Sequence, residues 1–309
     1  MTSPAPVLAG VFPVLATPFH RDGSPDEPGL AAIARYVIGA GADGVVFPGV
    51  ASEYETLTPE ERARLSDLVA NEARGRAAFV VGGSAAEMAT TEAIARRAQA
   101  QGAAALMVMA PKALTDAAGV AVFFQRVAAA AGNVPIMLQN APPPAGSGLP
   151  VDVVVAVASA VPQIAYIKEE AMPSGARITQ MLASAPGSLR GVFGGAGGRY
   201  ITDELARGAV GTMPACELAE LHVALLKAHR AGDRAGVRRL FNCMLPLLNF
   251  QAVFRMAMTK ETLRRRGIIA HAGKRAAGPQ LDAGDHRELS ELLAEVADLL
   301  QPPVRVGHV

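Results

Sequence analysis

The chain has 309 residues, of which 50% are apolar and 18% charged, so it can bury the core of one large domain or two ordinary ones and is not mainly disordered. A formal net charge of +1 leaves no basic surplus for a polyanion, which excludes nucleic acid as an expected partner. Residues 1–10 lack the features of a signal peptide, no apolar run could span a membrane, and Cys216 and Cys243 have no metal-ligand spacing. We therefore expect a cytoplasmic protein with buried thiols and no membrane partner.

Short apolar runs alternate with longer segments rich in Ala, Glu and Arg from residue 11 to residue 214. The apolar runs, which are nearly continuous as in strands covered on both faces, are residues 11–16, 44–47, 78–81, 104–109, 135–139, 164–168, 189–193 and 210–213. The segments between them, predicted as amphipathic helices, are residues 28–40, 59–74, 86–101, 117–131, 151–160, 176–184 and 201–207. This alternation predicts repeated βα units.

Eight such strands in roughly 200 residues predict a closed (β/α)8 TIM barrel rather than an open doubly wound sheet. The glycine-rich spots at Gly82 and Gly194 lack the GxGxxG spacing of a dinucleotide site. Beyond residue 214 the pattern is helical, at residues 217–230, 234–248, 251–266 and 286–300, with 272–285 as a linker. We expect the barrel to cover residues 1–230 and a C-terminal helical extension to cover residues 231–309.

The sixth apolar run ends in a lysine, Lys168. In a barrel of this kind the C-terminal ends of the strands form the mouth where the chemistry takes place. Strand alternation puts Tyr166 and Lys168 on one face, and if that face is the inner one, the lysine reaches the mouth from an apolar wall. Desolvation there would lower its pKa and favour the free amine that attacks a ketone to form a Schiff base. The alternative is an ordinary lysine that extends to solvent and pairs with a neighbouring carboxylate.

The ends of the other predicted strands supply candidate substrate-binding residues, namely Thr17, Val50, Ala51, Ser52, Asn140, Gly194 and Met213. Gly49 permits a tight turn, after which consecutive backbone N–H groups could receive a substrate carboxylate. Thr58 and Glu61 predict a capping box for the helix that follows. Gly194 either lets the backbone approach a ligand or makes a tight turn.

Four segments in this order resemble the dihydrodipicolinate synthase and N-acetylneuraminate lyase superfamily of class I aldolases and dehydratases. GVFPVLATPF at residues 10–19 is similar to its first-strand motif, GVASE at 49–53 to its GTTGE loop, LQNAPPP at 138–144 to YNxP, and YIKEE at 166–170 to its Schiff-base lysine motif. The resemblance covers nearly the whole chain. It implies a TIM barrel with a helical C-terminal extension, a homotetramer or homodimer, no metal or organic cofactor, and a 2-keto acid held as an iminium on Lys168.

The chain departs from the family at the positions that relay protons. In the family, two threonines of the GTTGE loop, the tyrosine of YNxP and a tyrosine after strand 4 form that relay. The matching positions here hold Val50, Ala51, Gln139 and Ala113, none of which titrates. Members that act on aspartate semialdehyde also use an arginine where this chain has Pro144. We therefore do not expect a dihydrodipicolinate synthase.

These losses favour one reaction over another. Retro-aldol cleavage needs a base for the C4 hydroxyl, and Gln139 cannot accept a proton at neutral pH. Dehydration needs removal of a C3 proton and protonation of the leaving C4 hydroxyl. Gln139 and Asn140 can orient hydroxyls, while Glu53, Tyr54 or Glu170 can supply the acid or base. We predict a dehydratase of a 2-keto-3-deoxy sugar acid; the alternatives are retro-aldol cleavage to pyruvate and an aldehyde, and a catalytically silent 2-keto-acid-binding barrel.

The candidate catalytic residues are therefore Lys168, Glu53 and Gln139. Glu53 has a structural alternative, in which it accepts backbone N–H bonds of its own loop, and Glu170 has another, a structural ion pair. Tyr54 can equally be a packing residue. The 6 histidines form no pair with metal-ligand spacing, so we expect no metal, no cofactor, and a small-molecule 2-keto acid as the partner.

Overall fold

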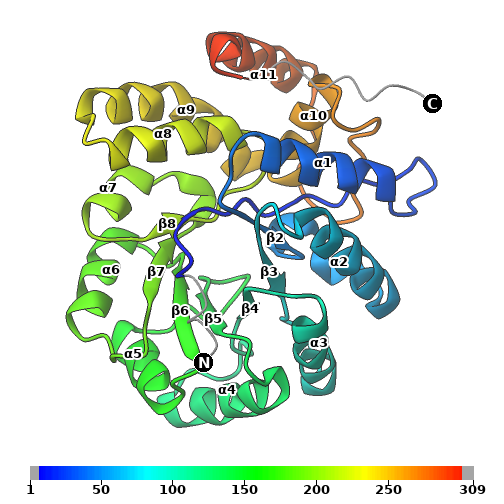
Figure 1. Cartoon of the computed structure of the whole chain (residues 1–309). Helices are drawn as coiled ribbons and strands as arrows, with labels where there is room; N and C mark the ends of the chain where they lie inside the picture. The colour runs from blue at the N-terminus through cyan, green and yellow to red at the C-terminus, as the bar shows by residue number, and fades with distance from the viewer. Residues whose placement is uncertain (1–6, 301–309) are drawn as a thin grey trace.

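The computed structural model describes residues 7–300, which form a barrel of parallel strands surrounded by helices (Figure 1). The 8 strands make one sheet in the order β1-β8-β7-β6-β5-β4-β3-β2. They are β1 (Gly10–Val11), β2 (Gly44–Phe47), β3 (Ala78–Gly82), β4 (Ala105–Val108), β5 (Ile136–Asn140), β6 (Ile164–Glu169), β7 (Gly191–Gly194) and β8 (Gly211–Thr212). The helices that follow them are α1 (Glu27–Gly39), α2 (Pro59–Ala73), α3 (Met88–Ala100), α4 (Ala117–Ala131), α5 (Val151–Ala160), α6 (Ser174–Ala183), α7 (Ile201–Ala206) and α8 (Ala219–Arg230). The predicted (β/α)8 barrel is confirmed.

The first and last strands are shorter than predicted. β1 and β8 pair over two residues each, because Pro13 has no N–H to donate and interrupts the ladder. The barrel closes one step further along the chain, where Val14 bridges both Val46 of β2 and Ala215 beyond β8. The predicted strands at residues 11–16 and 210–213 are therefore at the correct positions, but they are longer than the strands in the structure.

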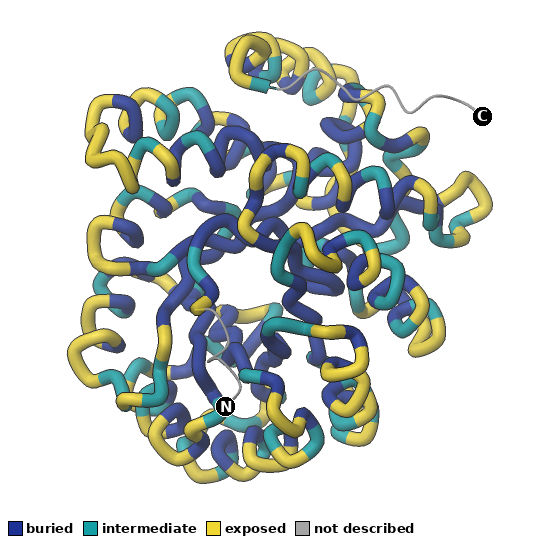
Figure 2. The backbone as a smooth tube through the Cα atoms, in the orientation of Figure 1, coloured by how far each residue is buried: buried dark blue, intermediate teal, exposed yellow. Residues whose placement is uncertain are grey.

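Two layers of apolar side chains hold the barrel together, one inside the strands and one between the strands and the helices. Figure 2 shows the burial along the backbone, with the buried stretches in dark blue. The inner layer consists of Leu8, Phe12, Val14, Val46, Val80, Ala105, Met107, Met137, Ala165, Tyr166, Phe193 and Met213. Tyr166 of β6 meets the ring of Phe193 edge-on at 6.2 Å, whereas its neighbour Ile167 belongs to the outer layer. This alternation confirms that Tyr166 and Lys168 share the inner face of β6.

Beyond α8 the described chain continues in α9 (Arg234–Phe254), α10 (Met256–Arg265) and α11 (Ala283–Glu295). α9 contacts α7, α8, α10 and α11, so it joins these helices to the barrel (Figure 1). The predicted helix break between residues 248 and 251 is wrong, since α9 continues through Pro246 and ends at Arg255, where φ is 51°. The predicted last helix is also displaced, because Asp282 caps α11 and starts it earlier. The predicted domain boundary after residue 230 falls in the turn between α8 and α9 and stays a prediction.

The capping box and the two cysteines are local features that the sequence predicted. Thr58 Oγ1 accepts from the Glu61 N–H while the Glu61 carboxylate accepts from the Thr58 N–H, so the capping box is confirmed. Cys216 is buried, but Cys243 is only partly buried, so the prediction of buried thiols holds for Cys216 alone. None of the helices within residues 7–300 is long and apolar enough to cross a membrane.

Candidate active site

Lys168 lies near the end of β6 with its side chain on the inner face of the barrel. The side chain is 4% exposed, and its Nζ lies 3.3 Å from Oε1 of Glu170. In the sheet, Lys168 is paired in register with Gln139 of β5 on one side and with Phe193 of β7 on the other. The lysine therefore combines the two environments considered from the sequence, since it is buried at the mouth and also paired with a carboxylate.

Glu170 is held in place from three directions. Gln139 donates from Nε2 to Oε2 at 2.6 Å, and the backbone N–H of Ala196 donates to Oε1 at 3.2 Å. Gly195 lies so close that a Cβ at this position would be 2.4 Å from Cγ of Glu170. Burial alone would raise the pKa of Glu170, but the ammonium of Lys168 and these hydrogen bonds outweigh it and lower that pKa. Glu170 is therefore an ionised carboxylate fixed beside the lysine.

Glu169 is the next carboxylate along the chain and makes a separate network on the other face of β6. It accepts from Asn140 Nδ2 at 2.9 Å and from the Ala171 N–H at 2.6 Å, and Arg177 lies 3.3 Å away. The Asn140 amide also donates to and accepts from the backbone of Leu149, at 3.0 and 2.8 Å. The structure thus places Asn140, a predicted substrate-binding residue, in the network that holds the loop between β5 and α5.

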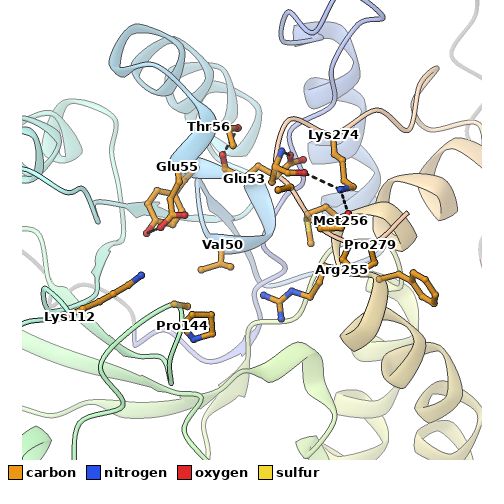
Figure 3. Close-up of a pocket in the computed structure, with 16 residues that line it drawn as sticks. Val50, Glu53, Glu55, Thr56, Lys112, Pro144, Arg255, Met256, Lys274 and Pro279 are labelled. Carbon is orange, nitrogen blue, oxygen red and sulfur yellow. Dashed lines mark hydrogen bonds between the residues drawn. The ribbon is translucent and has the colours of Figure 1, made fainter. Parts of the chain in front are cut away.

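A cavity of about 230 Å³, here called the inner cavity, opens at the barrel mouth beside Lys168 and Glu170. The predicted substrate-binding residues Val50, Ala51 and Met213 line this cavity. Residues 142–145 form another part of its wall, together with side chains from the C-terminal helices. Val50 and residues 144–145 also line an adjoining outer chamber of about 580 Å³ (Figure 3). The two spaces adjoin, because they share these wall residues.

The loop after β2 presents unused backbone donors at the inner cavity. Within residues 7–300 the N–H groups of Val50 and Ala51 have no hydrogen-bond acceptor, so they could receive a carboxylate as predicted. Ser52 and Thr17 serve the loop itself. The Ser52 hydroxyl accepts from the Gly49 N–H at 2.9 Å, and the Thr17 hydroxyl donates to the Ser52 carbonyl at 2.6 Å. Since both are fully buried, they shape the loop instead of facing the cavity.

Glu53 ties the same loop to the C-terminal part of the chain. Its Oε2 accepts from the backbone N–H groups of Arg275 and Ala276 at 2.8 and 2.6 Å, and Oε1 forms an ion pair with the buried Lys260. Glu53 lines the outer chamber and not the inner cavity. It therefore accepts backbone N–H bonds, as the structural alternative predicted, but from residues 275–276 and not from its own loop.

Removing Lys260 is expected to destabilise the protein strongly. The Lys260→Met variant would leave the Glu53 carboxylate buried without its ammonium partner, which costs about 3–5 kcal/mol of unfolding free energy. In the wild type, burial lowers the pKa of Lys260 to about 8, although the neighbouring Glu53 carboxylate raises it. The lysine is therefore still mainly charged at pH 7. Urea denaturation at pH 7 measures the change. The double variant Glu53→Gln, Lys260→Met should recover part of the loss, and equal losses in the two variants would contradict the account.

Tyr54 was a candidate acid or base, and its surroundings keep its hydroxyl protonated. The hydroxyl donates to Glu55 Oε1 at 3.2 Å, and the Arg62 guanidinium carbon lies 5.3 Å from the ring centre. Burial, with a further contribution from Glu55, raises the pKa of Tyr54 to about 12. Tyr54 is therefore poorly suited to act as a base at neutral pH.

Gly194 makes room for a buried carboxylate. A Cβ at Gly194 would lie 1.9 Å from Oε2 of Glu204, which is 1% exposed and accepts at Oε1 from the Ser174 hydroxyl at 2.7 Å. Burial raises the pKa of Glu204 to about 7, and the nearby carboxylates of Glu170 and Glu169 raise it further against the effect of Ser174. The missing side chain of Gly194 thus accommodates Glu204, and its role in letting the backbone approach a ligand stays a prediction.

The raised pKa of Glu204 predicts a dependence of stability on pH. The folded protein holds a proton on Glu204 up to about pH 7, whereas the unfolded chain releases it near the ordinary value of 4.5. Stability from this group is therefore full below pH 4.5 and is lost as the pH rises through 7. Between pH 5 and pH 8 the wild type should lose on the order of 3 kcal/mol relative to Glu204→Gln. Urea unfolding at both pH values tests this, and identical pH profiles of the two proteins would contradict it.

Sequence reasoning placed the lysine but undervalued or missed three charged groups at the cavity. The sequence leaves Glu170 between an acid or base and a structural ion pair, although residues 166, 168 and 170 have the same parity along the strand. Arg199 and Arg255 also line the inner cavity and were not singled out. Arg199 lies in the loop after β7, so its position after a predicted strand could have indicated it as a residue at the barrel mouth. Arg255 could not be found in this way, because it lies at the unpredicted break between α9 and α10.

Known proteins similar to this chain share both its sequence and its architecture. Residues 7–295 match the sequence model described as Dihydrodipicolinate synthetase family. The chain is 27% identical to an L-2-keto-3-deoxyarabonate dehydratase of Azospirillum brasilense, over 93% of this chain and 94% of that protein. It is 30% identical to a 4-hydroxy-tetrahydrodipicolinate synthase of Acidobacterium capsulatum, over 96% and 98%. The crystal structure of dihydrodipicolinate synthase from Rhodopseudomonas palustris is similar with a TM-score of 0.86 at 26% identity, over 93% and 97% of the two chains.

Proposed function

Since the chain belongs to the dihydrodipicolinate synthetase family and is a lyase, we propose that it binds a 2-keto acid as a Schiff base on Lys168 and dehydrates a 2-keto-3-deoxy sugar acid. One observation carries the proposal: Glu170 lies 3.3 Å from the lysine, where Gln139 holds it in the absence of the family tyrosine. The relative named as an L-2-keto-3-deoxyarabonate dehydratase, which matches over most of both chains, supports the same reaction class.

The cavity offers a group for each step of a dehydration. The N–H groups of Val50 and Ala51 receive the substrate carboxylate. The Lys168 ammonium first releases a proton to solvent, and the free amine then attacks the C2 carbonyl; loss of water gives the iminium. Glu170 removes a C3 proton and delivers it to the C4 hydroxyl, which leaves as water. Hydrolysis of the iminium then regenerates the lysine, so the net change is the loss of one water from the substrate.

In this account Gln139 is a positioning residue. Its amide donates to one oxygen of Glu170 and thereby turns the other toward Lys168, where the reacting carbons are held. A glutamine is suited to this purpose because it carries a donor that does not titrate at neutral pH. The predicted catalytic role of Gln139 is therefore refined to the orientation of the carboxylate.

Aldol cleavage remains the second candidate function because the same carboxylate could take the proton of the C4 hydroxyl. The two reactions differ in their products, so a panel of 2-keto-3-deoxy pentonates and hexonates separates them. Dehydration predicts a product 18 Da lighter than the substrate by mass spectrometry, whereas cleavage predicts pyruvate, which lactate dehydrogenase detects. Pyruvate as the main product would contradict the proposal. A Schiff-base adduct without any product would favour the silent binding barrel. The homotetramer or homodimer stays a prediction, which sedimentation measures.

A further inference from the structure

Two arginine side chains reach the inner cavity without a partner. Arg199 and Arg255 both line it, and within residues 7–300 neither guanidinium has a hydrogen bond or an ion pair. Nε of Arg199 is buried and unpaired there. Arg199 is partly buried, and burying part of a cation without an acceptor is unfavourable, so this group in a cavity wall indicates an anion that the cavity receives. Arg255 is exposed and is free to pair with the same anion.

Arg255 is directed to the cavity by an unusual backbone. It separates α9 from α10 with a φ of 51°, a conformation that is unfavourable for a non-glycine residue. In Figure 3 its guanidinium extends toward the space between Val50 and Pro144. All three residues line both the inner cavity and the outer chamber. Arg255 therefore stands where the inner cavity meets the outer chamber.

The charges around the cavity leave these arginines unbalanced. Glu170, the carboxylate that lines the inner cavity among the described residues, is paired with Lys168. In the outer chamber, Glu53 is paired with Lys260, and Lys274 donates to two backbone carbonyls. Glu55 and Lys112, which have opposite charges, also line this chamber. A 2-keto acid whose carboxylate lies on the loop after β2 leaves both arginines available to a second anion at its other end.

We propose that the substrate carries a second anionic group, a carboxylate or a phosphate, at the end remote from its keto group, and that Arg199 and Arg255 bind this group. The inference rests on the proposed function, because that function places the keto carbon on Lys168 and the first carboxylate on Val50 and Ala51. Guanidinium groups suit the task, since they bind carboxylate and phosphate oxygens with paired, charge-assisted hydrogen bonds.

Matched pairs of 2-keto acids test the proposal by borohydride trapping on the full chain. For a carboxylate we compare 2-oxoglutarate with 2-oxopentanoate and 2-oxoadipate with 2-oxohexanoate; for a phosphate, 2-keto-3-deoxy-6-phosphogluconate with 2-keto-3-deoxygluconate. The acid with the second anion should reach half-maximal trapping at an about 10- to 100-fold lower concentration. The pair that shows this difference identifies the anion.

Variants assign the difference to the arginines. Arg199→Gln and Arg255→Gln should each remove most of it while leaving the half-maximal concentration of pyruvate unchanged. Arg255→Gly serves as a second variant, because glycine accepts the positive φ without strain and keeps the fold. Arg239→Gln, on an exposed face of α9, is the control and should retain the difference.

The failures are distinguishable. If adducts form on Lys168 with equal ease for both members of every pair, or if the variants weaken pyruvate as much as the diacids, the second-anion inference is wrong and the Schiff base stands. If no keto acid forms an adduct, the proposed function is wrong. In that case, calorimetry that compares the binding of glutarate and pentanoate tests the second-anion inference separately. Tighter binding of glutarate that depends on Arg255 supports the inference, and equal binding of the two acids overturns it.

Discussion

The Lys168→Met variant is expected to lose turnover of every 2-keto-3-deoxy acid that the wild type converts. Methionine fills the same space but has no amine, so the covalent route through the iminium is closed and no other group at the inner cavity can replace it. Steady-state assays by mass spectrometry of the product measure the loss, which should reach the detection limit. Thermal unfolding shows whether the fold survives the unpaired Glu170.

The matched control replaces a lysine outside the barrel mouth. Lys227 is exposed on α8 and lines neither the inner cavity nor the outer chamber, so Lys227→Met should keep wild-type kcat and KM. If Lys168→Met, with its sequence and fold confirmed, retains full turnover, a Schiff base on Lys168 is not part of the reaction.

Glu170→Gln is expected to lower kcat by about 10²–10⁴-fold, the usual contribution of a positioned acid or base. Glutamine keeps the shape and its one oxygen can still accept from either Gln139 or Ala196, but it cannot take a proton from C3. The adduct with pyruvate on Lys168 should still be trapped at saturation, because Schiff-base formation does not depend on C3 chemistry. A large fall in kcat with retained adduct therefore separates a catalytic role from a structural one.

The neighbouring carboxylate provides the comparison. Glu169 is bound by Arg177 of α6 and Asn140 of β5, so Glu169→Gln should act on stability and leave kcat within about tenfold of the wild type. If Glu170→Gln retains wild-type kcat, or if Glu169→Gln shows the larger fall, Glu170 is not the acid or base of the reaction.

The sequence predicts the barrel well because its signals are local and repeated. Each strand is a short apolar run, and the alternation along residues 164–168 puts Tyr166 and Lys168 on one face, which the structure shows to be the inner one. The capping box at Thr58 is equally local. The extent of β1 is not, because it depends on Pro13 and on the partner strand β8.

The rest of the site depends on contacts between distant parts of the chain. Glu53 meets Lys260 and residues 275–276, which are more than 200 positions away, so no local pattern reveals that both of its oxygens are occupied. Arg255 reaches the cavity only because α9 continues past Pro246, a residue that usually ends or kinks a helix. Such pairings require the folded arrangement of the C-terminal helices against the barrel.

The central claim is that Lys168 binds a 2-keto acid covalently, and borohydride reduction in the presence of pyruvate tests it most directly. The account predicts a stable adduct whose peptide mass maps to Lys168, absent without borohydride and absent in Lys168→Met. An intact wild-type mass under saturating pyruvate and the substrate panel, or an adduct that maps to another lysine such as Lys112 or Lys260, would contradict it.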